Sequence, residues 1–133
     1  MPEELKSQRD EPNTLREYEL IFILRPNASS DQIQEVNSLV RGIVDEAGGK
    51  VLRLDNWGKR KLAYEIRKEM KGIYLYWLFL ANAGLIHEIE RKLRVNDMVI
   101  RHFSVKVDED VLPDARPDAI DDEAFTAAAT LVP

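Results

Sequence analysis

Apolar side chains occupy alternate positions between residues 18 and 24. One face of this run carries Tyr18, Leu20, Phe22 and Leu24. Alternation with a period of two is the pattern of a β-strand with a buried face, and Pro26 ends the run because proline cannot continue a strand interior. Ile21 and Ile23 make the second face apolar as well. The pattern therefore predicts a strand in the middle of a sheet.

A helical period follows this strand. Ser29 precedes Gln32 by three residues, which is the spacing of a capping box, and Gly48 and Gly49 end the pattern. The apolar residues between them recur three or four positions apart: Ile33, Val36, Leu39, Val40, Ile43, Val44 and Ala47. This spacing predicts an amphipathic helix with one buried face.

The period returns to two at residue 50 and predicts one long, bent strand over residues 50–67, interrupted by a bulge at Trp57–Gly58. A polar turn over 68–72 and a strand over 73–80 complete a hairpin. A short helix over about 85–94, a turn at Asn96–Asp97 and a last strand over 99–107 follow. In that last strand Arg101 is expected to share a face with Val99, Phe103, Val105 and Val107.

The element order βαββαβ predicts an α+β fold, the ferredoxin-like sandwich. In this fold a four-stranded antiparallel sheet carries two helices on one face. The other face would carry Glu19, Ile21, Ile23, Tyr74, Tyr76, Leu78 and Leu80. An apolar and aromatic surface of this kind is expected to be covered by a partner.

Charge divides the 133-residue chain into three parts. The whole chain has a formal charge of −5, whereas residues 108–133 carry −7 and residues 1–15 carry −2, which leaves +4 for the middle. Both ends are rich in acidic residues and poor in periodic apolar residues, a composition typical of disorder. We therefore expect a flexible N-terminal extension (1–15), a mildly basic domain (16–107) and an acidic, disordered C-terminal tail (108–133).

Candidate catalytic and metal-binding chemistry is sparse. The chain has no cysteine, its two histidines lack a neighbouring nucleophile or carboxylate at a relay spacing, and Gly48–Gly49 lacks a phosphate-loop context. We expect no enzymatic activity, metal, cofactor or small-molecule substrate. No apolar run is long enough to span a membrane, and the amino terminus is charged. The sequence predicts a soluble intracellular protein without a membrane partner.

Cations concentrate in the predicted hairpin, at Lys59, Arg60, Lys61, Arg67, Lys68 and Lys71. They could protect a solvated edge strand from aggregation, or they could contact the phosphates of a nucleic acid. Residues 71–74 approach the base-stacking motif of RNA-recognition domains, but Ile73 stands where that motif has an aromatic residue. The spacing alone leaves both readings open.

Four motifs resemble the bacterial small-subunit ribosomal protein six family. They are Arg16-x-Tyr18-Glu19, Trp57-Gly58-x-Arg60-x-Leu62-Ala63-Tyr64-x-Ile66, Gly72-x-Tyr74 and Asn96-Asp97-x-Val99-x-Arg101. The resemblance covers residues 16–107 with matching order and lengths. The chain departs from the family at Glu65, where proline is usual, and in its 15-residue N-terminal extension.

The resemblance implies a non-enzymatic component of the cytoplasmic ribosome. Such a protein binds the central domain of small-subunit ribosomal RNA cooperatively with ribosomal protein eighteen. By position, the implied RNA-binding residues are Arg16, Tyr18, Lys59, Arg60 and Arg101. The implied partner-binding residues are Trp57, Leu62 and Tyr64. The alternation of the first strand points Tyr18 toward the helices, where core packing competes with RNA contact.

Two other functions fit the same fold. One is a ferredoxin-like oligomerising or ligand-binding module that uses the exposed sheet face and needs no RNA. The other is a generic binder of single-stranded RNA, which the failed base-stacking motif and the modest charge of the domain disfavour.

Overall fold

The computed structural model describes residues 14–117, 120 and 125. In chain order its elements are the strand β1 (Leu15–Leu24), the helix α2 (Ser30–Glu46), the strands β2 (Lys50–Ile66) and β3 (Glu69–Ala81), the helix α3 (Ala83–Arg94), the strand β4 (Val99–Val111) and the short 3-10 helix η1 (Pro113–Ala115). The expected N-terminal extension lies outside the described residues as far as position 13. Most of the expected tail beyond position 117 lies outside them as well.

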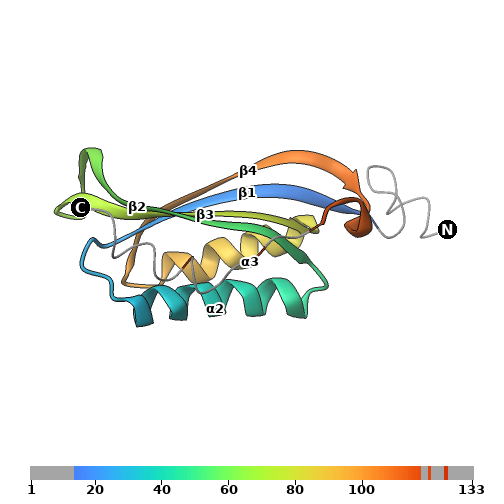
Figure 1. Ribbon diagram of the computed structural model, residues 1–133, viewed down its shortest axis with the longest axis horizontal. Coiled ribbons are helices and arrows are strands. Elements are labelled where there is room, and N and C mark those ends of the chain that lie inside the picture. The colour runs from blue at the N-terminus through green and yellow to red at the C-terminus, as the bar shows by residue number, and fades with distance from the viewer. Residues whose placement is uncertain (1–13, 118–119, 121–124, 126–133) are drawn as a thin grey trace.

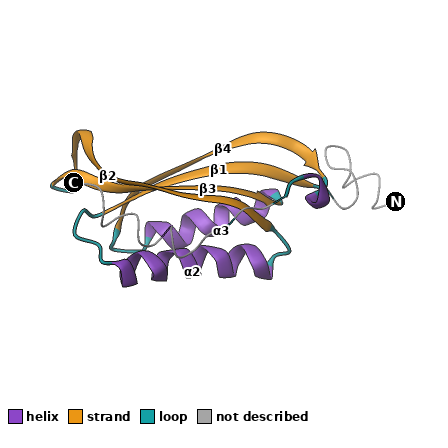
Figure 2. Ribbon diagram, in the orientation of Figure 1, coloured by secondary structure: helices purple, strands orange, loops and turns teal. Residues whose placement is uncertain are grey.

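The strands form one antiparallel sheet in the order β2-β3-β1-β4. Strands β1 and β3 are therefore central, as the apolar character of both their faces predicts. Figures 1 and 2 show both α-helices on the same side of this sheet. The predicted ferredoxin-like βαββαβ sandwich is confirmed. We call the side of the sheet opposite the helices the open face.

The main hydrophobic core lies between the helices and the sheet. Leu20, Phe22 and Leu24 of β1 are fully buried in it, as is Trp77 of β3. Helix α2 begins at the predicted capping box, because the Ser29 side chain accepts a hydrogen bond from the Gln32 amide and the Gln32 side chain accepts one from the Ser29 amide. The predicted inward faces of β1 and β3 are thus confirmed, and α2 buries Ile33, Val36, Val40 and Val44 of its predicted face, whereas Ala47 is exposed.

The turn between β2 and β3 is tighter than the sequence predicts. It consists of Arg67 and Lys68, with φ angles of 48° and 66°, and Ile66 pairs directly with Glu69. Two consecutive left-handed residues match the twist of a two-residue hairpin. The predicted turn over 68–72 was wrong because positive φ is usually associated with glycine or asparagine, and neither residue is present at these positions.

Strand β4 differs from its prediction in two respects. Its register shifts between Val99, which lies opposite Leu24, and Arg101, which lies opposite Ile23. This irregularity places Val99 in the helix-side core while Arg101 lies on the open face, so the expected common face for these two residues was wrong. The strand also continues beyond residue 107 to Val111.

Candidate nucleic-acid interface

The β2–β3 hairpin gathers cations at one end of the sheet. The register pairs Lys59 with Ile73, Arg60 with Gly72 and Lys61 with Lys71, and the turn adds two more cations. Arg101 reaches the same end because its neighbour Ile23 on β1 also pairs with Tyr74. We call this region the hairpin end: Lys59, Arg60, Lys61, Arg67, Lys68, Lys71 and Arg101.

The lysines of the hairpin end have no counter-charges in the part of the chain that the structure describes. Among the described residues, no hydrogen bond or ion pair is formed by the side chains of Lys59, Lys61, Lys68 and Lys71. Lys61 and Lys71 lie directly opposite one another, an arrangement in which like charges repel and destabilise a sheet. An anionic partner would relieve this repulsion.

A β-bulge brings an aromatic stack to the open face beside these cations. The register of β2 shifts between Asn56 and Gly58, and Gly58 has a φ of 80°, a conformation that favours glycine. The Trp57 ring stacks on Tyr76 with centroids 5.3 Å apart. The Arg60 guanidinium lies 5.6 Å from the Trp57 ring centroid, and its Nε donates to the Trp57 carbonyl at 3.1 Å. The bulge predicted at Trp57–Gly58 is confirmed. The Trp57 carbonyl within it accepts the hydrogen bond from Arg60 Nε and so holds the Arg60 side chain in place.

Tyr76 anchors the inner side of this stack. Its hydroxyl donates a hydrogen bond of 2.6 Å to Glu19 Oε2 on the neighbouring strand. Burial, together with this hydrogen bond and the nearby Glu19 charge, raises the pKa of Tyr76 far above its ordinary value. The phenol therefore stays protonated, and remains a donor to Glu19, well above physiological pH.

Residues 62–65 of β2 leave the regular ladder. Lys61 pairs with Lys71, and the next pair is Ile66 with Glu69. The four residues 62–65 of β2 therefore lie opposite a single residue of β3, Met70. Figure 1 shows this part of β2, in green, rising on the side away from the helices. The irregularity buries Leu62 against Ile23 and Ile100 on the open face.

Tyr64, in the same stretch, positions Arg101. The Tyr64 side chain is 57% exposed, and its hydroxyl accepts a hydrogen bond of 2.6 Å from Arg101 Nη1. The Arg101 guanidinium carbon also lies 5.8 Å from the Tyr64 ring centroid. An exposed guanidinium held by an aromatic ring keeps further N–H groups available for phosphate oxygens.

A mostly apolar cleft of about 360 Å³ lies between the irregular part of β2 and the sheet. It is lined by Ile23, Leu62, Ala63, Tyr64, Ile66, Tyr74, Arg101, His102 and Phe103. Phe103 is 46% exposed. Apolar concavities that carry a few polar groups accept side chains of a protein partner.

Arg16 and Tyr18 lie away from the hairpin end. On β1 they pair with Ala81 and Phe79, whereas Ile23 pairs with Tyr74 near the hairpin. At about 3.3 Å per residue, the seven positions from Arg16 to Ile23 span roughly 23 Å. Tyr18 is buried with its ring centroid 5.9 Å from that of Phe79, and Arg16 is only 9% exposed. The structure thus brings together all the predicted site residues except these two.

The network around Tyr76 and the apolar wall at Phe103 were not predicted as site features. Tyr76 appeared in the sequence only as a member of the open face, and its hydrogen bond to Glu19 joins residues 57 positions apart. Strand alternation placed Phe103 on the same face as Arg101, but it gave no indication that Phe103 would line a site. No local signal indicates that the β2 irregularity would form a cleft against it.

The described part of the chain has neither a metal-binding cluster nor a membrane-spanning helix. No three His, Asp or Glu side chains lie close enough there to hold a metal ion. Neither described α-helix is long and apolar enough to cross a membrane.

Comparison with known proteins identifies one family. Residues 17–106 match the family described as Ribosomal protein S6. The small ribosomal subunit protein bS6 of Geobacter sp. (strain M21) is 43% identical over 103 residues, which are 77% of this chain and 77% of that protein. Its counterpart from Carboxydothermus hydrogenoformans is 37% identical over 95 residues, which are 71% of this chain and 99% of that protein.

Solved structures agree with the sequence comparison. The crystal structure of 30S ribosomal protein S6 from Thermotoga maritima has a TM-score of 0.65 and 31% identity, and the match covers 70% of this chain and 88% of that one. The C-terminal domain of the MgtC protein from Mycobacterium tuberculosis, at 12% identity and a TM-score of 0.51, shares the fold alone. The chain belongs to the ribosomal protein S6 family and is therefore a non-enzymatic ribosomal protein.

Proposed function

We propose that this chain binds the central domain of small-subunit ribosomal RNA, cooperatively with ribosomal protein eighteen, as a structural component of the small ribosomal subunit in the cytoplasm. The relatives carry the name of small-subunit proteins. The observation that supports the RNA contact is a set of lysines that have no counter-charge among the described residues, beside two arginines that aromatic rings hold in place.

Phosphate contact explains the arrangement of these cations. Each Lys or Arg that neutralises a phosphate releases condensed counterions, so affinity depends on salt and little on base sequence. Arg60 and Arg101 are already ordered by Trp57 and Tyr64. Binding therefore costs them less side-chain entropy than it costs a freely rotating cation.

The cleft beside the cations is the proposed docking site for ribosomal protein eighteen. Its lining includes Leu62 and Tyr64 of β2, Tyr74 of β3 and Phe103 of β4. Trp57 contributes by supporting Arg60, since its ring is stacked on Tyr76. A partner seated here would lie next to Arg101, so the two proteins would present one joint surface to the RNA. Arg16 and Tyr18 have packing roles in this arrangement.

Single substitutions test the RNA contact. Lys59→Ala, Arg60→Ala and Arg101→Ala are each expected to weaken binding to a central-domain RNA fragment and to lower the salt slope of log K by about 1. Arg91→Ala is the matched control, because Arg91 is paired with Glu88 on α3. Slopes that stay at the wild-type value in all three variants would refute the assignment.

A separate substitution tests the partner site. Ala63 is exposed and lines the cleft, so Ala63→Gln adds polar bulk there without changing charge. We expect RNA affinity without ribosomal protein eighteen to stay as in the wild type and the enhancement by that protein to be lost. Full enhancement in this variant would place the docking site elsewhere. Self-association without RNA binding in the wild type would favour the oligomerising module instead.

A further inference from the structure

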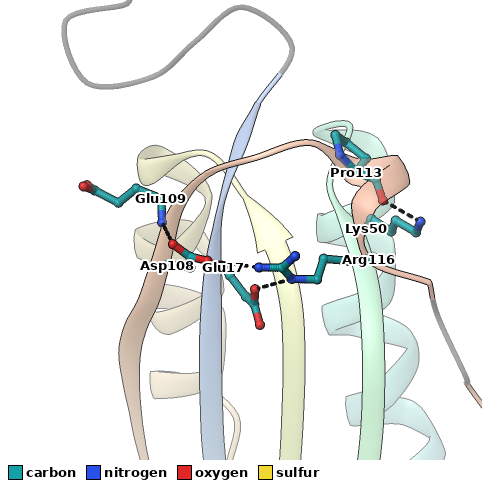
Figure 3. Close-up of polar contacts among 6 residues, drawn as sticks. All are labelled: Glu17, Lys50, Asp108, Glu109, Pro113 and Arg116. Carbon is teal, nitrogen blue, oxygen red and sulfur yellow. Dashed lines mark hydrogen bonds and ion pairs between the residues drawn. The ribbon is translucent and has the colours of Figure 1, made fainter.

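After β4 the chain crosses the end of the open face farthest from the hairpin. Val111 is 5% exposed and packs there with Leu52 and Leu80, and Leu15 and Leu78 border them. We call these five residues the far end. Lys50 Nζ donates a hydrogen bond of 2.9 Å to the Pro113 carbonyl, which fastens η1 to the first residue of β2 (Figure 3). The apolar far end is thus covered by the chain itself.

Arg116 fastens the same segment to two further strands. Its Nε lies 2.9 Å from Glu17 Oε1 on β1, and its Nη2 lies 3.0 Å from Asp108 Oδ2 on β4 (Figure 3). The Asp108 carboxylate is itself oriented by the Glu109 amide, which donates to Oδ1 at 2.8 Å. Glu17 pairs with Leu80 of the far end. Arg116 therefore lies on the open face.

A second anchor lies on the opposite side of the sheet. Phe125 is 2% exposed within the helix-side core, with its ring edge-on to Trp77 at 6.2 Å. Its carbonyl accepts a hydrogen bond of 2.6 Å from Asn56 Nδ2 on β2. Ile120 packs against the same core. The chain is therefore on the open face at Arg116 and on the helix side at residues 120 and 125, and it is bonded to β2 from both sides.

Strand β2 is an edge of the sheet, and an edge offers unpaired backbone groups to any other strand. We propose that the contacts of Pro113, Arg116 and Phe125, here called the clip, hold β2 from both faces of the sheet and keep another strand, including one from a second copy of this chain, from adding to that edge. These residues lie beyond the family match, which ends at 106. The clip belongs to this chain's extension and does not depend on RNA binding.

Hydrogen exchange of the full chain tests the clip. In Arg116→Ala and in Phe125→Ala, amide exchange over residues 50–56 of β2 is expected to rise by roughly tenfold or more, as for a locally opened unit, while residues 59–71 of the hairpin change little. The matched controls are Arg91→Ala, a paired arginine on α3, and Phe103→Ala, an exposed phenylalanine on the open face. Both should exchange as the wild type does.

Sedimentation at increasing protein concentration provides the second readout. We expect the Arg116→Ala, Phe125→Ala double variant to self-associate at concentrations where the wild type and the controls remain monomeric. If Phe125→Ala raises exchange throughout the chain, the protein has lost its core. Phe125→Leu then takes the place of Phe125→Ala and is tested beside Arg116→Ala, since both of these variants spare most of the core. Unchanged exchange over 50–56 in both clip variants, or a double variant as monomeric as the wild type, would overturn the proposal.

Discussion

The two ends of the open face use their cations differently. At the far end and the adjoining start of β2, Lys50 bonds to the Pro113 carbonyl, Arg53 pairs with Asp55 at 2.9 Å, and Arg116 pairs with Glu17 and Asp108. At the hairpin end, Lys59, Lys61, Lys68 and Lys71 have no such partners among the described residues. The presence of cations alone does not distinguish the two ends, since both carry them. What marks a candidate anion-binding surface is whether the protein has already satisfied its cations.

Apolar residues show the same division. Leu80 at the far end is fully buried, and Val111 at the end of β4 and Leu52 pack against it. At the hairpin end the apolar residues line an open cleft, and Tyr64 and Phe103 are 57% and 46% exposed. The far end is completed by the chain itself, whereas the hairpin end remains available to a partner.

The largest expected effect on stability comes from replacing one buried leucine at each end of the open face by alanine. Leu80→Ala should lower the free energy of unfolding by about 3–5 kcal/mol, because the enclosed site retains a cavity. Leu62→Ala should cost about 2 kcal/mol, the low end of the range for a buried leucine, because its cluster borders an open cleft that water can enter. Urea unfolding measures both. Equal losses would show that the hairpin end is as much a structural core as the far end.

The next largest effect on stability is expected from substitution of Gly72, which lies at the hairpin end. A Cβ at Gly72 would lie 2.4 Å from Ile23 Cγ2 and 3.1 Å from the Leu24 carbonyl. Gly72→Ala should therefore destabilise the protein by about 1–3 kcal/mol through overpacking, and thermal unfolding measures it. Gly42→Ala is the control, since nothing lies within 4 Å of a Cβ there. A Gly72→Ala variant as stable as the wild type would mean that β1 and β3 separate easily at this end.

Charge removal should affect stability at one end and binding at the other. Arg116→Ala is expected to cost about 0.2–1 kcal/mol, the range for partly exposed ion pairs, with RNA affinity unchanged. Lys61→Ala should leave stability unchanged or raise it slightly, because it removes the repulsion with Lys71, and it should weaken RNA binding. Chemical unfolding and RNA titration separate the two effects. Loss of RNA affinity in Arg116→Ala, with RNA affinity unchanged in Lys61→Ala, would contradict this difference between the two ends.

The smallest effect concerns the helix side of β4. Burial lowers the pKa of His102 in the folded protein, so the unfolded chain takes up a proton first as the pH falls below about 6.5. Stability is then lost toward lower pH until the folded-state pKa is passed. His102→Gln should flatten this part of the profile of unfolding free energy against pH.

Local patterns in the sequence predicted most of the fold. Alternation at Leu20 and Phe22 identified the buried face of β1, Ser29 and Gln32 marked the start of α2, and Gly58 marked the bulge. Each of these signals acts within a few residues and has a direct physical cause. The same alternation indicated that Tyr18 would face the helices, where the structure places it.

Other features depend on contacts that no local pattern encodes. The turn uses Arg67 and Lys68 in a conformation unusual for both, and the irregularity near Ile100 moves Val99 to the other face. Phe125 is buried against Trp77 although it lies in an acidic stretch that predicts disorder. Pairing between distant segments decides the turn, the register of β4 and the burial of Phe125. It also decides which lysines have no counter-charge among the described residues.

The most direct test compares two triple variants that remove the same charge from opposite ends. One carries Lys59→Ala, Lys61→Ala and Lys71→Ala, and the other carries Lys50→Ala, Arg53→Ala and Arg116→Ala. Binding to the central-domain RNA fragment is measured for both across a salt series. If the unpaired cations of the hairpin end contact phosphate, the first variant lowers the salt slope of log K by about 3 and the second leaves it at the wild-type value. Equal losses of slope in the two variants would show that RNA responds only to overall charge and would contradict the assignment.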